Sequence, residues 1–246
     1  MLSTDVAGRL RNGLLLGIVT ALAAFPYLFH QSMGAWSAPI ARDWGVGGEA
    51  GTIFAFEFSL LLGVIFMCSI IGVFLSERYN LPGFGKARDA YQIAYRYGAP
   101  ALLFGLVVGW LLHDRTFYQV VPAETGIDLY PRNVLWSVAL LLNVSVMKEM
   151  VFRFGVLTLA AGLFRGRRPI LAVVLTAVFA ASFSVRELLF VDYARLDAQV
   201  WYCVIWSFIS NIILGMVFVR KGLLSSMSLR ACVDMRFVLY PILGMV

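Results

Sequence analysis

The stretch SVMKEMVFRFGVLT, residues 145–158, decides how this chain is interpreted, because it places charged side chains inside an apolar run long enough to cross a membrane. The charged residues are Lys148, Glu149 and Arg153. Ionisable groups at bilayer depth are costly, and those that occur there face a bundle interior or an aqueous cavity and commonly mark function. The stretch is therefore either a reaction centre or a buried structural ion-pair cluster.

The whole chain has the composition of an integral membrane protein. Of its 246 residues, 61% are hydrophobic and 14% are charged, and the mean hydropathy is +0.83. Soluble domains contain roughly 45–50% apolar and about 25% charged residues. A crossing needs about 20 largely apolar residues, and suitable segments lie at 13–29, 52–75, 98–113, 134–164, 169–189, 200–219 and 222–243. The sequence predicts an all-α, polytopic transmembrane helical bundle with about seven membrane-spanning helices.

Basic residues alternate between the loops of this bundle. They precede the first predicted helix and follow the second, fourth and sixth: Arg9, Arg11, Arg78, Lys86, Arg88, Arg96, Arg165, Arg167, Arg168, Arg220 and Lys221. Because cytoplasmic loops retain Lys and Arg, we predict a cytoplasmic N-terminus, in the inner membrane of a prokaryotic cell. The net charge of +6 is accounted for by this placement, and we expect membrane lipids as partners and no nucleic acid.

The chain contains no recognisable soluble domain or internal repeat. We expect one continuous membrane domain, with N-terminal helices at 1–133 and a core at 134–246. The stretch GFGKARDAYQIAYRYG, residues 83–98, alternates basic residues with tyrosines, which predicts a helix lying in the cytoplasmic interface. GLLLG at 13–17 and GLVVG at 105–109 place glycines four apart on apolar helices, which permits close helix packing within the protomer.

Six ionisable groups fall inside predicted helices, and their charges balance. They are Lys148, Glu149, Arg153, Arg230, Asp234 and Glu57. Two of the possible pairs are four residues apart and so share a helix face. Because an unpaired charge in a low dielectric is costly, we predict a structural charge network. It requires that the 134–164 and 222–243 helices pack together, with Lys148 or Glu149 opposite Arg230 or Asp234.

The same residues offer little for catalysis. A metal site needs about three converging ligands, and the helices of the second half contain no histidine, so we predict no metal and no cofactor. Cys68, Cys203 and Cys232 stand alone, without zinc or disulfide spacing. Glu149 is the one catalytic candidate, although the cations Lys148 and Arg153 beside it favour a permanently ionised carboxylate.

From KEMVFRFGVLTLAAGLFRGRR, residues 148–168, onward, the chain resembles the CAAX protease and bacteriocin-processing (CPBP) family of intramembrane proteases. That family carries E-E-x-x-x-R, then F-x-x-x-H on the next helix, then H-x-x-x-N or H-x-x-x-D on the last. The corresponding stretches here are residues 148–153, FAASF at 179–183 and RACVD at 230–234.

The chain departs from the family pattern at the positions to which the resemblance assigns catalytic roles. Lys148 stands in the place of the first glutamate, and Phe183 and Arg230 stand in the places of the two histidines. The resemblance assigns water activation and oxyanion stabilisation to those positions. We expect Phe183 to fill the volume of an imidazole in the buried site.

The resemblance therefore implies a proteolytically inactive protein that acts as a binding or assembly subunit for another membrane protein, a peptide or a lipid. Two alternatives stay open. One is a divergent intramembrane endopeptidase that uses Glu149. The other is a carrier of a small molecule or an ion.

Overall fold

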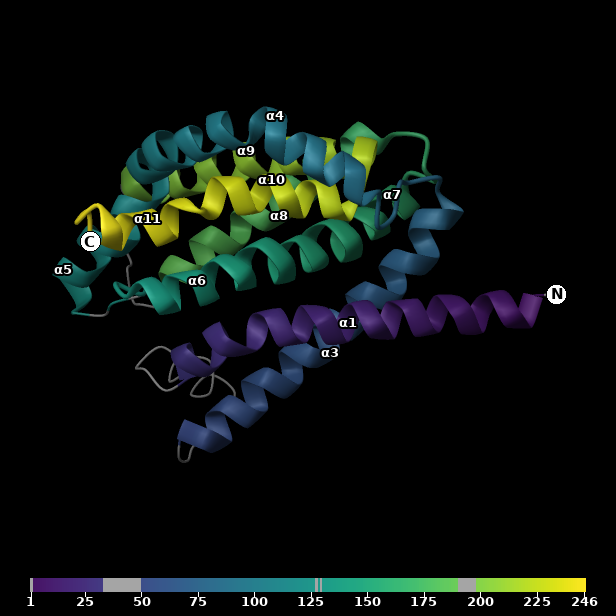
Figure 1. The fold of residues 1–246 in the computed structure, drawn as a ribbon, viewed down its shortest axis with the longest axis horizontal. Helices are drawn as coiled ribbons and strands as arrows, with labels where there is room; N and C mark the ends of the chain where they lie inside the picture. Colours follow the sequence, from purple (N-terminus) through teal and green to yellow (C-terminus); the bar gives the residue numbers. More distant parts are fainter. Residues whose placement is uncertain (1, 33–49, 127, 129, 190–197) are drawn as a thin grey trace.

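The computed structural model describes residues 2–32, 50–126, 128, 130–189 and 198–246, and these residues form helices without a strand (Figure 1). The first half contains α1 (Leu2–Ser32), α3 (Ala50–Arg78), α4 (Ala87–Phe104), η1 (Gly105–Asp114), η2 (Thr116–Val120) and α5 (Val121–Thr125). The second half contains α6 (Val134–Leu142), η3 (Asn143–Lys148), η4 (Met150–Leu157), α7 (Thr158–Leu163), α8 (Pro169–Leu189), α9 (Ala198–Lys221), α10 (Leu223–Asp234) and α11 (Arg236–Ile242). The η segments are π-helical and continue neighbouring α-helices.

The predicted polytopic helical bundle is confirmed. Six described helices are long and apolar enough to cross a membrane: Val6–His30, Phe54–Arg78, Ala87–Asp114, Val134–Leu163, Pro169–Arg186 and Ala198–Lys221. The seventh predicted span, 222–243, is instead divided between α10 and α11, and α10 with 12 residues is too short to cross alone. The two helices together run along the bundle, so that the C-terminus lies at the end opposite the N-terminus (Figure 1).

The predicted interfacial helix at 83–98 is not a separate element. Residues Ala87–Asp114 form one helical run, because neither Gly98 nor Pro100 interrupts the helix. This run lies beside α10 (Figure 1). The side chains of Tyr91, Tyr95 and Tyr97 are exposed.

Glycines let the helices approach closely inside the protomer, as predicted. A Cβ atom on Gly13 would lie 3.1 Å from Cα of Ile70 on α3, and one on Gly105 would overlap the carbonyl oxygen of Val233 on α10. The GLLLG stretch therefore packs α1 on α3, and the GLVVG stretch packs η1 on α10.

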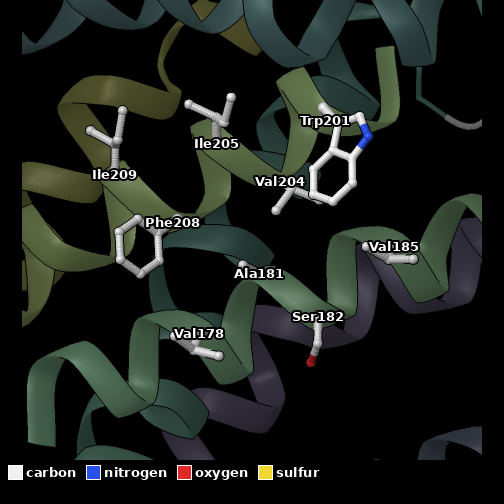
Figure 2. Close-up of a pocket in the computed structure, with 9 residues that line it drawn as sticks. All are labelled: Val178, Ala181, Ser182, Val185, Trp201, Val204, Ile205, Phe208 and Ile209. Atoms are coloured by element: carbon white, nitrogen blue, oxygen red, sulfur yellow. The ribbon is translucent and has the colours of Figure 1, made fainter. Parts of the chain in front are cut away.

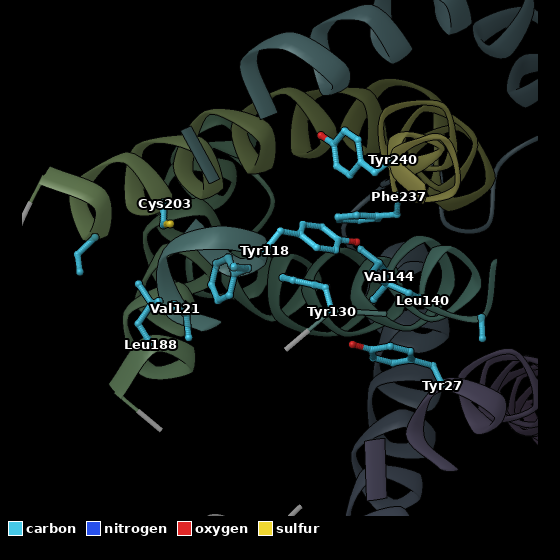
Figure 3. Close-up of a cluster of buried hydrophobic side chains, with 13 residues drawn as sticks. Tyr27, Tyr118, Val121, Tyr130, Leu140, Val144, Leu188, Cys203, Phe237 and Tyr240 are labelled. Carbon is cyan, nitrogen blue, oxygen red and sulfur yellow. The ribbon is translucent and has the colours of Figure 1, made fainter. Parts of the chain in front are cut away.

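An aromatic core joins the two halves of the chain (Figure 3). The rings of Tyr130 and Phe237 stack with centroids 5.6 Å apart, and Tyr118 meets Tyr240 edge to face at 5.8 Å. Tyr27 from α1 belongs to the same cluster. Because residues from α1, η2 and α11 share this core, the first helices and the second half pack as one body.

Candidate functional site

Glu149 lies in the middle of the longest helical run of the second half, where η3 meets η4. Its side chain is 1% exposed, and that of Arg153, one turn later, is 0% exposed. The Arg153 Nε and Glu149 Oε2 atoms are 3.3 Å apart. The two residues predicted to share a helix face therefore form a buried ion pair.

Arg153 also connects this helix to α9. Its Nη2 group donates a hydrogen bond of 2.6 Å to Oδ1 of Asn211, and Nδ2 of Asn211 donates to the carbonyl oxygen of Ser207 at 2.6 Å. Asn211 was missed in the sequence analysis. A signal existed, because it is a polar amide in the apolar run of residues 203–219.

Several buried polar atoms around Glu149 lack a hydrogen-bond partner among the described residues. They are Asn143 Oδ1, Ser145 Oγ, Glu149 Oε2, and Arg153 Nε and Nη1. Glu149 and Arg153 lie within ion-pair distance, yet Nε does not point at Oε2 well enough to form a hydrogen bond. We call Glu149, Arg153 and Asn211, together with Asn143 and Ser145 on the same helical run as Glu149, the Glu149 cluster. Buried unpaired groups cost free energy, and this cluster is only partly paired by the described residues.

The other predicted ion pair, between Arg230 and Asp234, is formed along α10. Asp234 has a second partner in Arg236 on α11, which the sequence analysis did not select. No ion pair joins Lys148 or Glu149 to Arg230 or Asp234 in the described part of the chain. The 134–164 and 222–243 helices do contact each other, but the predicted single network is wrong in this respect. Lys148 is half-buried and has no ion-pair partner among the described residues.

Arg236 holds a second set of charges. Its Nε donates to Asp114 Oδ2 at 2.5 Å, and the Tyr240 hydroxyl donates to the same oxygen at 2.8 Å. Nδ1 of His113 lies 2.8 Å from Asp114 Oδ1. The predicted span ended at residue 113, but η1 extends to Asp114 and places its carboxylate inside the bundle.

We call His113, Asp114, Arg230, Asp234, Arg236 and Tyr240 the Asp114 cluster. Its two aspartates face two arginines, so its formal charge is balanced when His113 is neutral. It connects η1 to α10 and α11. The sixth predicted network residue, Glu57, lies on α3, and its side chain is outside the described part of the structure.

Phe183 does not fill a buried site, contrary to expectation. Its side chain is 41% exposed. Its ring packs edge to face on Phe152 at 5.7 Å and on Phe179 at 5.2 Å. The three rings form a partly exposed aromatic patch between α8 and η4.

An apolar groove of about 470 Å³ runs between α8 and α9 (Figure 2). Its lining residues are Val178, Ala181, Ser182, Val185, Trp201, Val204, Ile205, Phe208 and Ile209. The groove is open rather than enclosed, and Glu149 does not line it. Within the described residues, no three His, Cys, Asp or Glu side chains gather as a metal site would need.

Comparison with models of known protein families gives a match to one region of the chain. The family model described as Type II CAAX prenyl endopeptidase Rce1-like matches residues 130–236. This range includes all three motif stretches, at 148–153, 179–183 and 230–234. No curated protein and no solved structure matches the chain.

Proposed function

Because residues 130–236 form an Rce1-like domain within a helical membrane protein, we propose that this protein uses the fold of an intramembrane protease to bind a membrane partner without cleaving it. The observation that carries the proposal is which residues occupy three motif positions: Lys148 stands in the place of a glutamate, and Phe183 and Arg230 stand in the places of two histidines. Phenylalanine has no titratable group, and arginine stays protonated in proteins. Lysine accepts a proton only when it has first lost its own.

The state of Glu149 supports the same conclusion. The Arg153 guanidinium beside it is fully buried and is held in place by Asn211. Cations flank Glu149 at positions 148 and 153, and the Arg153 Nε lies 3.3 Å from Glu149 Oε2. A general base must give and take a proton during turnover, whereas here the carboxylate is the partner of a buried arginine in a structural ion pair.

The partner that fits the surface is an apolar transmembrane helix of another membrane protein. The α8–α9 groove is apolar, and the small side chains of Ala181 and Ser182 on α8 lie across the groove from the α9 side chains, which include Trp201 and Phe208 (Figure 2). Small residues let helix backbones approach closely in a bilayer, where packing rather than hydrophobicity drives association. The groove thus offers a place for a helix beside the former protease motifs.

The topology follows from the positions of the basic residues. The N-terminus and the basic turns at 78–86, 164–168 and 220–222 lie at one end of the bundle (Figure 1). We assign this end to the cytoplasm because cytoplasmic segments retain Lys and Arg. In a prokaryotic cell the corresponding membrane is the inner membrane. Cysteine labelling with an impermeant reagent tests the assignment: a cysteine placed at Arg167 should react only after the cells are opened.

Site-specific photo-crosslinking tests the binding role. A photoreactive residue at Ser182 in the groove should give one discrete protein adduct in cell membranes. The matched control is Leu103 on α4, which is also exposed but does not line the groove. Equal adducts from both positions would contradict a specific groove partner.

A proteolysis assay tests the absence of cleavage. Purified protein in vesicles is incubated with membrane peptides, including prenylated CAAX peptides, and products are followed by mass spectrometry. One observation favours the alternative endopeptidase, since Oε2 of Glu149 is buried without a hydrogen-bond partner and so is available to a water molecule. Cleavage that disappears in Glu149→Ala would establish that alternative.

A further inference from the structure

Three turns come together at the end of the bundle that carries the N-terminus (Figure 1). The turn at 79–86 contacts the α9–α10 junction, where the amide groups of Leu223 and Leu224 donate to the carbonyl oxygens of Gly83 and Phe84, both at 2.9 Å. The turn at 164–168 packs on Tyr79 (a Cβ atom on Gly166 would lie 3.3 Å from Cβ of Tyr79). This end is therefore an ordered surface built from the turns that join α3 to α4, α7 to α8 and α9 to α10.

The cations of this surface are exposed and mostly without acidic partners. Those that form no ion pair among the described residues are Arg78, Lys86, Arg88, Arg96, Arg165, Arg167, Arg168 and Arg220. Lys221 pairs with Asp89 at 3.3 Å, and Arg9 pairs with Glu77 at 2.9 Å. Because most of these cations have no acidic partner among the described residues, the surface carries a strong positive potential.

Four of these arginines form a compact group. The α7–α8 turn presents Arg165, Arg167 and Arg168, and its contact with Tyr79 brings it next to Arg78. The Arg78 guanidinium lies 5.8 Å from the centre of the Tyr79 ring. Arg165 has φ +51°, a left-handed conformation that is costly for a residue with a side chain. The turn holds this conformation while exposing its three cations.

The same turn is bordered by exposed apolar side chains. Leu163, the last residue of α7, is 75% exposed, and Ile170, at the start of α8, is 62% exposed. The candidate spans end at Leu163 and begin again at Pro169. The arginines therefore lie at the level where a bilayer changes from hydrocarbon to headgroups.

We propose that Arg78, Arg165, Arg167 and Arg168, here called the arginine group, bind the phosphate of an anionic phospholipid while Leu163 and Ile170 contact its acyl chains. Guanidinium forks match phosphate oxygens in a bidentate geometry, and juxtamembrane basic clusters attract anionic lipids. The adjacent apolar side chains select a lipid over free phosphate. This binding site is independent of the partner groove between α8 and α9.

Lipid competition tests the proposal. Delipidated protein in a neutral detergent is mixed with equal amounts of phosphatidylglycerol and phosphatidylcholine, and the lipids that stay bound after size-exclusion chromatography are quantified by mass spectrometry. The wild type should retain more phosphatidylglycerol. The combined change Arg78→Gln, Arg165→Gln, Arg167→Gln and Arg168→Gln should lower the ratio of the two lipids by about tenfold or more.

The control changes Arg115→Gln and Arg132→Gln, two exposed arginines outside the basic surface, and should keep the wild-type ratio. Equal retention of both lipids by the wild type, or an unchanged ratio in the four-arginine variant, would overturn the proposal. So would an equal loss in the control, or displacement of phosphatidylglycerol by inorganic phosphate at the same concentration. Should the four-arginine variant not fold, the salt dependence of wild-type retention decides, because a charge-driven preference must fall as salt rises.

Discussion

The Glu149 cluster and the Asp114 cluster use the same kinds of side chain, a buried arginine beside a buried carboxylate, yet they differ in how completely their groups are paired. Arg236 makes four hydrogen bonds, to Asp114, Asp234 and Val233. Arg153 makes one, to Asn211, and two of its nitrogens stay without a partner among the described residues.

This difference separates two uses of buried charge. A cluster whose donors and acceptors are matched fixes one packing of its helices, and here it holds η1 against α10 and α11. An incompletely paired cluster costs stability and persists where function has selected it. The incompletely paired cluster contains the first of the protease-like motifs, at 148–153, and the matched cluster contains the third, at 230–234.

The largest effect is expected for Arg236→Met. The change leaves Asp114 without its cation and Asp234 with only Arg230, so we expect a loss of about 3–5 kcal/mol in the free energy of unfolding. Unfolding by SDS titration in mild detergent measures it. The control is Arg115→Met, at the exposed position that follows Asp114, and it should change the free energy of unfolding by about 0.5 kcal/mol or less. Equal effects would show that the Asp114 cluster does not stabilise the fold.

Arg153→Met should cost less, about 2–3 kcal/mol, because Arg153 loses one hydrogen bond and one ion pair. The double change Glu149→Met and Arg153→Met should return to within about 1 kcal/mol of the wild type, since no charge is then left buried alone. The corresponding double change Asp114→Asn and Arg236→Met should recover only in part, because Asp234 keeps its ion pair with Arg230 but loses the hydrogen bond from Arg236. Full recovery in both clusters, in the same SDS titration, would erase the distinction between them.

Gly105→Ala should destabilise the helix contact beside the Asp114 cluster by about 1–3 kcal/mol, because the new methyl group overlaps the backbone of Val233. Gly63→Ala is the matched control. It has no atom within 4 Å of the added Cβ and should gain roughly 0.5–1 kcal/mol from helix propensity. Thermal unfolding of the two variants side by side gives opposite shifts if the packing is as described.

The smallest expected effect on stability is the difference between replacing Asn211 and replacing Asn143. Asn211→Leu removes the acceptor of Arg153 and should cost about 1–2 kcal/mol. Asn143→Leu removes an amide whose Oδ1 has no partner and should leave the stability unchanged or raise it. A loss of similar size in both variants, measured by SDS titration, would mean that Asn143 is paired in the folded protein.

Local patterns in the sequence predicted much of this molecule. The apolar runs placed six spanning helices, and four-residue spacing predicted the Glu149–Arg153 and Arg230–Asp234 pairs. These predictions hold because hydropathy and helical periodicity act over a few neighbouring residues. Glycine spacing likewise predicted the close contacts of α1 and η1.

Long-range partners could not be predicted in the same way. Asp114 and Arg236 are 122 residues apart in the chain, and Arg153 and Asn211 are 58 apart. Hydropathy places Arg153, Asn211 and Arg236 inside predicted helices and does not indicate which helix each one contacts. The error at Phe183 has the same origin, since the motif fixed its position along α8 but not the direction that this position faces.

The sequence by itself determined that the chain is a helical membrane protein whose residues 130–236 match an Rce1-like family model, because composition and spacing are properties of the chain alone. Only the tertiary structure decided that its buried charges divide into a matched and an unmatched cluster. Whether a buried donor finds an acceptor depends on the rotation and approach of packed helices, and these are set by the side-chain contacts of the whole bundle.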